Sequence, residues 1–308
     1  MTAAAVGSVV EANIDVYGSM ARASAIADYL EVAALAGQRI TSDDLADIAE
    51  QLNWSRKRRR QVLVDGDDPE DDPDGWPEVA FSVIDERIDI LGKHYPFKIS
   101  RRALRYSGPS DPSDSGYIGV LAITVVHAWG LTSTTQPTEE LEDLAARVLA
   151  ARNLDVARMG TADRSGVGFV ENLHAGASSL GLRPALNPVP RSRSAKDAGV
   201  DTLAALTWRD GRSGQWVMIG QATCAKSTEW KMKLAQPEPN TWRAYLQEAV
   251  DPLPFLVVPH HVEARHLALL LSSRRGLVLD RLRLVPAKRG NSDGERALAK
   301  VMLAAQVQ

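Results

Sequence analysis

The chain has 308 residues, of which 44% are hydrophobic and 24% are charged. These values predict a soluble globular protein with a substantial core, in one large domain or two domains of ordinary size. The formal net charge of −3 excludes a polycation, so any affinity for nucleic acid must come from local patches.

The single cysteine, Cys224, excludes an intrachain disulfide and a cysteine-based zinc site. The N-terminus lacks the basic start and apolar core of a signal peptide. The longest apolar run, 117–129, is too short to span a membrane and contains His127, which we assign to the core or its boundary. We therefore expect a cytoplasmic protein with no membrane partner.

Residues 1–155 are predicted to form a mainly helical domain that holds no catalytic constellation. Hydroxyl, acidic or proline residues mark the starts of several of its helices. The expected role of this domain is recognition, docking of a partner, or oligomerisation into a homo-oligomer. Its predicted helices cover 19–36, segments that begin at Thr41 and Pro77, 117–129 and 139–152.

A run of five basic residues, 56–60, follows Trp54. Arginines beside an aromatic ring suit contacts to a DNA backbone, whereas a solvated helix face is the ordinary interpretation of such a run. We favour the solvated face, because the acidic stretch 65–74 follows directly and its charge opposes phosphate binding.

Residues 156–308 are predicted to form a second domain, a mixed β-sheet flanked by helices, so the fold class is α/β (α+β overall). Its centre is a hairpin of two apolar strands, 201–208 and 216–221, joined by a turn at 210–214 with two glycines. Further helices are expected at about 163–180, 240–246, 261–272 and 293–306, and further strands at 255–258 and 277–284.

Polar residues gather at one end of this hairpin. Asp201 opens the first strand, and Gln221 ends the second at the head of a small polar turn. An acid, an amide oxygen and a nearby lysine form a set of groups that suits a divalent metal beside a phosphodiester.

The stretch 199–234 (GVDTLAALTWRDGRSGQWVMIGQATCAKSTEWKMKL) resembles the PD-(D/E)XK nuclease superfamily. It is similar to a divergent bacterial branch in which a strand ending in Gly-Gln precedes a polar turn, a tryptophan and Lys-Leu. The resemblance covers about 163–285 and implies a restriction-endonuclease-like core with the element order αβββαβ. Members of this branch are associated with restriction-like and phage-defence loci, which implies other defence-system proteins as partners.

The resemblance also implies roles for particular residues. Asp201 and Gln221 take the two metal-ligand positions of the catalytic hairpin, and Glu171 matches the helical glutamate that completes the site. The implied cofactor is Mg²⁺ or Mn²⁺, which would polarise the scissile phosphate and lower the pKa of an attacking water. A lysine would offset the charge that develops on the phosphate.

The sequence departs from the superfamily's pattern at two positions. Thr223 stands where a lysine is expected, two residues after the second ligand, and Gln221 replaces a carboxylate, which weakens metal affinity. Lys233 on the following helix is our first choice for a migrated lysine, Lys226 the second and Lys231 the third.

The remaining reactive side chains are assigned structural roles. We expect Cys224 to be a small buried residue rather than a nucleophile. His260 and His261 are interpreted as surface residues at a strand-to-helix junction, because the spacing of His261, Glu263 and His266 is poor for chelation. Three tryptophans, Trp208, Trp216 and Trp230, are assigned to the core.

The leading hypothesis is a magnesium-dependent endonuclease (a deoxyribonuclease) that acts on DNA in an antiviral defence system. The main alternative keeps the nuclease fold without the chemistry, as a decayed subunit that binds nucleic acid or a protein partner. A third hypothesis makes the N-terminal half the working part, with the C-terminal half holding partners.

Overall fold

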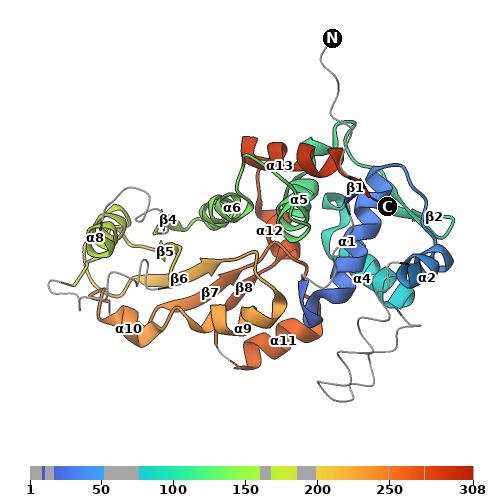
Figure 1. The fold of residues 1–308 in the computed structure, drawn as a ribbon. Coiled ribbons are helices and arrows are strands. Elements are labelled where there is room, and N and C mark those ends of the chain that lie inside the picture. Colours follow the sequence, from blue (N-terminus) through green and yellow to red (C-terminus); the bar gives the residue numbers. More distant parts are fainter. Residues whose placement is uncertain are drawn as a thin grey trace, which may run out of the picture. The chain divides into compact units, whose positions relative to one another are not determined.

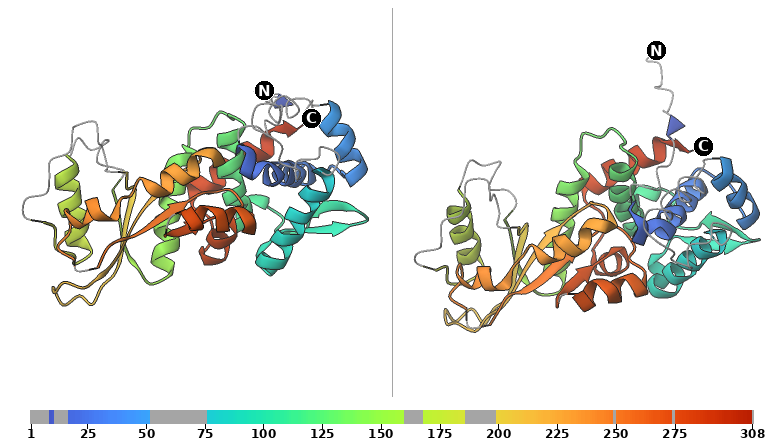
Figure 2. Two further views of the ribbon diagram at one scale, coloured as in Figure 1. Left: turned by 90° about the horizontal axis from the view of Figure 1, so that it is seen from below. Right: turned by 60° about the horizontal axis from the view of Figure 1, so that its bottom comes forward.

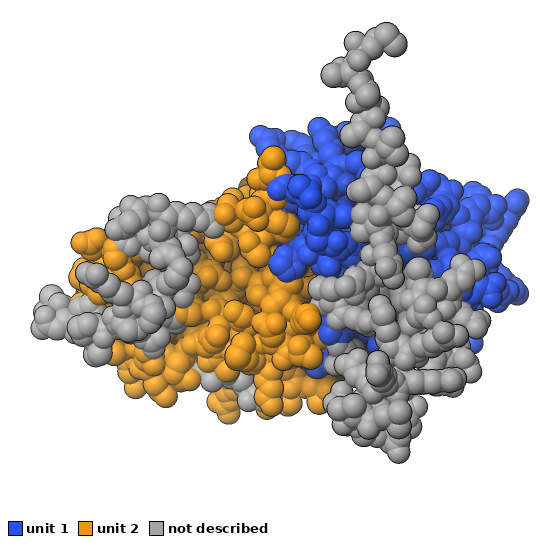
Figure 3. All heavy atoms as spheres, viewed as in Figure 1, with its two compact units in different colours: residues 1–133, 291–308 blue, residues 134–290 orange. Residues whose placement is uncertain are grey.

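The computed structural model describes residues 9–10, 17–51, 76–159, 168–185, 199–248, 250–273 and 275–307. They form a mixed α/β protein, which confirms the expected fold class (Figure 1). The chain divides into two compact units, with 1–133 and 291–308 in unit 1 and 134–290 in unit 2 (Figure 3). These bounds differ from the predicted division after residue 155. None of the helices in the described part combines the length and apolar composition needed to cross a membrane.

Unit 1 is mainly helical, as expected for the N-terminal part of the chain. Its single-turn 3₁₀ helices are η2 (Ser19–Ala21), η4 (Gly92–His94) and η5 (Pro112–Asp114). Its α-helices are α1 (Arg22–Leu35), α2 (Ser42–Gln51), α4 (Trp76–Leu91), α5 (Gly116–Ala128) and α13 (Asp293–Ala304). Its strands are β1 (Val9–Val10), β2 (Phe97–Ser100), β3 (Ala103–Tyr106) and β9 (Gln306–Val307).

The C-terminal helix α13 belongs to unit 1 because it packs against α5. A capping box between Ser292 and Glu295 starts α13 and satisfies backbone N–H groups of its first turn. Just before it, the Asn291 side chain donates hydrogen bonds of 2.7 and 2.9 Å to the carbonyl oxygens of Ser113 and Ser115. Residues nearly 180 positions apart in sequence are thereby fixed together.

A buried charge network holds the helices of unit 1. The Arg87 guanidinium on α4 contacts the carboxylates of Asp28 and Glu31 on α1 at 2.8 and 2.7 Å, and all three side chains are fully buried. The hydroxyls of Tyr95 and Tyr117 also donate to Glu31. Burial lowers the pKa of Arg87, but the charges of Glu31 and Asp28 outweigh it and raise that pKa well above its usual value. The Arg87 guanidinium therefore stays charged in the folded unit.

Replacing Arg87 with leucine leaves two buried carboxylates without their cation. We expect Arg87→Leu to lower the free energy of unfolding by about 3–5 kcal/mol, because a broken buried ion pair leaves an uncompensated charge. Urea denaturation followed by circular dichroism measures this loss. The exposed Arg39 supplies the control, since Arg39→Leu should change stability by no more than about 0.5 kcal/mol. Equal urea midpoints for the two variants would contradict the role given to the network.

Unit 2 contains a five-stranded sheet and its covering helices. The strands are β4 (Asp155–Arg158), β5 (Thr202–Leu206), β6 (Trp216–Ala222), β7 (Leu253–Val257) and β8 (Leu277–Leu279). The helices are α6 (Pro137–Ala151), α8 (Phe169–Ser179), α9 (Ser227–Ala235), α10 (Pro239–Arg243), α11 (Ala264–Ser273) and α12 (Arg281–Ala287).

The strand order is β4-β5-β6-β7-β8, with the first two pairings antiparallel and the last two parallel. Strand β4 is absent from the prediction because it has no apolar run. It forms one edge of the sheet. The predicted strand at 277–284 is too long, because Asp280 caps α12 by accepting from the backbone N–H of Arg283. The succession α6-β4-β5-β6-α9-β7, with α8 and α10 as additions, is an αβββαβ order.

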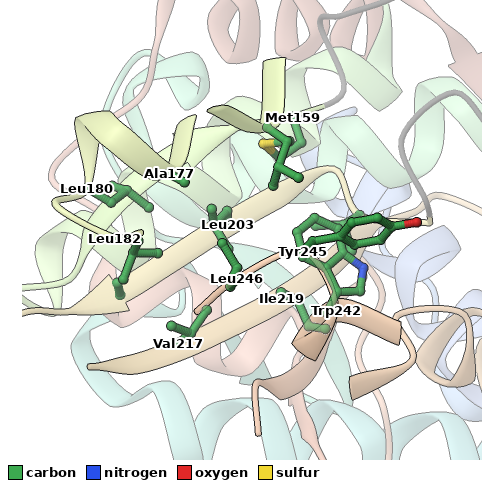
Figure 4. Packing of buried hydrophobic residues seen from close by; sticks show 13 residues of the cluster. Met159, Ala177, Leu180, Leu182, Leu203, Val217, Ile219, Trp242, Tyr245 and Leu246 are labelled. Carbon is green, nitrogen blue, oxygen red and sulfur yellow. The ribbon is translucent and has the colours of Figure 1, made fainter. Parts of the chain in front are cut away.

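The two faces of the sheet carry different helices (Figures 1 and 2). One face presents Leu203 and Ile219 to a buried cluster with side chains of α8 and α10 (Figure 4). Helix α9 covers the same face nearer to β7 and β8. By the strand register, Gly276 lies in one row with Pro254 and Ile219, and a Cβ added to Gly276 would lie 3.1 Å from the Leu234 side chain of α9. Helix α6 packs against β4, β5 and β6 on the opposite face.

Candidate active site

Asp201 lies at the start of β5 and is held by both neighbouring strands. Its backbone N–H donates to the carbonyl of Gly220, and its own carbonyl accepts from Met159, at 2.9 and 2.7 Å. One carboxylate oxygen, Oδ2, accepts a hydrogen bond of 2.9 Å from the backbone N–H of Ala222. Asp201 therefore extends the hydrogen-bonding ladder of the sheet and also presents a charged side chain at its end.

Gln221 lies near the end of β6 and is 7% exposed. Its side-chain oxygen Oε1 is buried and accepts no hydrogen bond from the described residues. A buried polar atom without a partner costs free energy, so such an atom requires an explanation, which a bound ion can supply.

The register between β5 and β6 brings these two residues together. The paired register ends with Thr202 opposite Gly220, and the backbone N–H of Asp201 bonds to the Gly220 carbonyl rather than to Gln221. The Asp201 carboxylate accepts from the backbone N–H of Ala222, the residue after Gln221, so Asp201 and Gln221 lie at the same end of the two strands. Gln221 lies on the face of β6 that carries Ile219, at the polar end of a buried apolar cluster.

Glu171, the third predicted ligand, is placed elsewhere. It is exposed in the first turn of α8, where its Oε2 accepts a hydrogen bond of 3.4 Å from the backbone N–H of Gly168. The helix faces the sheet through Leu173 and Ala177. Because Glu171 is two residues before Leu173, it projects to the other side of the helix. The structure gives Glu171 the role of capping its own helix and does not bring it to the Asp201–Gln221 pair.

The predicted lysines lie on α9, which covers the face of the sheet that carries Gln221. Lys226 immediately precedes the helix and Lys233 lies in its last turn. The seven-residue spacing places both on one side of α9, whereas Lys231 projects to the opposite side and is exposed. Thr223 is buried, and its hydroxyl accepts from the backbone N–H of Ala225.

Three further polar residues lie at the same end of the sheet. His260 and His261 follow β7, whose end is bonded to Thr223 by a hydrogen bond from Thr223 N–H to the Val257 carbonyl. The predicted surface position of the two histidines is wrong, because they are 2% and 0% exposed. The sequence signal that could have placed them is their position directly after a buried strand.

Asp280, which follows β8, is also buried at this end of the sheet. Burial raises the pKa of its carboxyl, while His261 and hydrogen bonds from Val262 and Arg283 lower it. Its Oδ2 accepts from the backbone N–H of Val262 at 3.2 Å. Asp280 therefore ties the histidine segment to the start of α12.

Cys224 is buried, as expected, and burial raises the pKa of its thiol, which keeps it protonated. The assignment of three tryptophans to the core is right for Trp230, which is 0% exposed, and wrong for the other two. Trp208 and Trp216 flank the turn of the β5–β6 hairpin and are 77% and 66% exposed.

A cavity of about 400 Å³ in unit 2 lies away from this pair. It is lined by apolar residues of α6, β8 and α12 and by Met218, with Arg152 and Arg283 among its lining residues. Met218 is an odd number of residues from Gln221 on β6, so its side chain lies on the opposite face of the sheet. The cavity is therefore separate from the Asp201–Gln221 pair.

The described residues hold no group of three or more His, Cys, Asp or Glu side chains arranged to bind a metal. The oxygen donors at the candidate site are one carboxylate and one amide oxygen that has no hydrogen-bond partner among the described groups. Mg²⁺ takes oxygen ligands, keeps several waters and is commonly held by one or two carboxylates. The donor set therefore fits a weakly held divalent cation.

No protein-family model, curated protein or solved structure matches this chain.

The ladder role of Asp201 predicts different effects for two substitutions. Asp201→Ala removes the acceptor for the Ala222 N–H and should lower the free energy of unfolding by about 1–3 kcal/mol. Asp201→Asn retains an acceptor oxygen and should cost less than about 1 kcal/mol. Thermal and urea denaturation of both variants measure the difference. Equal losses would show that the hydrogen bond to Ala222 does not stabilise the sheet.

Proposed function

We propose that unit 2 is a metal-dependent nuclease domain that hydrolyses phosphodiester bonds, with DNA as the substrate. The observation that carries the proposal is the buried Gln221 oxygen, which accepts no hydrogen bond from the described residues and belongs to the neighbour of Ala222, whose backbone N–H bonds to the Asp201 carboxylate. Two oxygen donors at one end of the sheet form the minimum of a Mg²⁺ or Mn²⁺ site.

The order of elements supports the same proposal. The nuclease superfamily that the sequence resembles is built on an αβββαβ core, and α6-β4-β5-β6-α9-β7 has this order. In that alignment Asp201 precedes the second strand and Gln221 lies near the end of the third, where the superfamily carries its acidic residues. The strand β4, absent from the sequence-based expectation, supplies the first strand of this order.

The residues of the site have two roles, which are binding of the cation and compensation of charge on the phosphate. Asp201 and Gln221 bind and orient the cation, which when bound supplies Lewis acidity at the scissile phosphate and an activated water. Lys233 or Lys226, on the side of α9 that they share, offsets the negative charge that develops on the phosphate. The apolar cluster that continues along the same face from Leu203 and Ile219 limits water behind the pair.

A second candidate function is a nuclease-fold subunit that binds nucleic acid or a protein without cleaving. Three observations favour it: Thr223 replaces the usual lysine, Glu171 caps its own helix, and Asp201 already accepts a hydrogen bond from Ala222. In the setting of a defence system, such a subunit would recognise substrate for a catalytic partner. The two functions differ in whether the purified chain alone cleaves.

Cleavage of supercoiled plasmid and labelled oligonucleotides tests the first function. With Mg²⁺ or Mn²⁺ we expect nicked and linear plasmid, and with EDTA no product. Asp201→Asn should reduce the rate by about a hundredfold or more, because it removes the one carboxylate of the site and keeps the hydrogen bond to Ala222. Asp201→Asn is the sharper variant, since Asp201→Ala also weakens the sheet.

Lysine variants of α9 provide the matched comparison. Lys233→Met and Lys226→Met should lower the rate, by about tenfold or more for the lysine that reaches the phosphate. Lys231→Met, on the opposite side of the same helix, should leave it unchanged. Cleavage that ignores EDTA or survives Asp201→Asn contradicts the proposed chemistry. The absence of cleavage by wild type on every substrate favours the binding subunit.

Gln221→Glu tests the metal site by a gain of function. A second carboxylate at the same strand end as Asp201 adds like-charge repulsion without metal, so the variant should melt below wild type in EDTA. With Mn²⁺ the added charge should tighten binding on the order of tenfold, and the stabilisation by Mn²⁺ should exceed that of wild type. Differential scanning fluorimetry across a Mn²⁺ series measures both effects. Equal metal responses of Gln221→Glu and wild type would place the cation elsewhere.

A further inference from the structure

The β2–β3 hairpin of unit 1 has a turn whose residues are poorly suited to its backbone. Ser100 pairs with Ala103, so the loop consists of Arg101 and Arg102 alone. Both have left-handed backbones, with φ of 52° and 61°. A two-residue hairpin turn with two positive φ angles is of type I′, which favours Asn-Gly because side chains beyond Cβ strain this conformation. The turn geometry therefore does not account for two arginines.

The strands of the hairpin also carry residues that oppose its folding. Lys98 on β2 stands directly opposite Arg105 on β3, and both side chains are exposed. Like charges at opposite positions of an antiparallel pair destabilise the sheet. The other face carries Phe97 and Leu104, which are buried. The apolar face explains how the hairpin packs. The four basic residues of the hairpin do not contribute to this packing.

No compensation for these charges is present among the described residues. Lys98, Arg101, Arg102 and Arg105 form no ion pair with a carboxylate of that part of the chain. The ten residues 97–106 contain four basic residues and no acidic one. Within the described part of the chain, these cations therefore have no carboxylate partner.

Two helices of unit 1 expose the opposite charge. The exposed positions of α2 include Asp43, Asp44 and Asp47, and those of α4 include Asp85 and Asp89. The basic hairpin is thus a local feature rather than the general surface character of an acidic protein. Positive charge concentrated on one projecting ribbon is typical of proteins that bind polyanions.

We propose that the β2–β3 hairpin binds the phosphate backbone of nucleic acid, with Arg101 and Arg102 contacting phosphates at the tip and Lys98 and Arg105 along the strands. Guanidinium groups pair with phosphate oxygens in a bidentate geometry, which suits this chemistry better than lysines alone. The tip carries no large apolar residue that could enter a lipid bilayer, so nucleic acid fits better than a membrane surface. The inference concerns binding by unit 1 and stands whether or not unit 2 cleaves.

The turn itself supplies a variant that removes charge without harming the fold. Arg101→Asn combined with Arg102→Gly installs the preferred residues of a type I′ turn, so the melting temperature should stay equal or rise. Binding is measured with the full chain, in EDTA, by fluorescence anisotropy of labelled duplex and single-stranded DNA. We expect affinity to fall about tenfold or more, and the slope of log K against log salt to lose about 1 to 2.

A matched control removes the same charge elsewhere in unit 1. Arg39→Gln combined with Lys93→Gln replaces two exposed cations outside the hairpin strands and should keep wild-type affinity and salt dependence. Because the titration is done in EDTA, binding by the hairpin is measured apart from cleavage. Wild-type affinity in the turn variant overturns the proposal. The proposal is also overturned if the wild-type protein binds phosphatidylserine vesicles or polyglutamate but does not bind nucleic acid.

Discussion

The register between β5 and β6 is the constraint on which the candidate site depends. It is fixed from both sides of β6. On one side, Asp201 bonds to Gly220 through its backbone and to Ala222 through its carboxylate. On the other side, the ring of Phe255 lies so close to Gly220 that a Cβ there would come within 2.4 Å of it. A slip of β6 by one residue would move Gln221 to the opposite face of the sheet.

The two units use charged groups in different ways. In unit 1 the cation of Arg87 is buried with its carboxylates and joins α4 to α1, whereas the arginines of the hairpin turn are exposed and unneutralised by the described carboxylates. In unit 2 the polar residues gather where the strands end, because side chains there lie beyond the apolar cluster. In the functions proposed above, the hairpin of unit 1 binds nucleic acid, and the oxygen donors of unit 2 hold a cation.

The sequence predicts the parts of the structure that depend on local pattern. The apolar helix at Tyr117 and the β5–β6 hairpin follow from apolar runs and turn residues. Prediction from the sequence fails where tertiary contacts determine the structure. The edge strand β4 has no apolar run, and the burial of the histidines after β7 is indicated only by their position directly after a buried strand. Glu171 matches a ligand by order along the chain, but its position in the helical turn directs it away from the sheet.

The central claim is that Asp201 and Gln221 together hold a divalent cation. Isothermal titration of Mn²⁺ into the full chain, with Asp201→Asn as the comparison, tests it without reference to cleavage. The account predicts one Mn²⁺ bound by wild type and no measurable binding by the variant, which keeps the hydrogen bond to Ala222 and the fold of the sheet. Equal Mn²⁺ binding by the two proteins, or none by wild type, would contradict it.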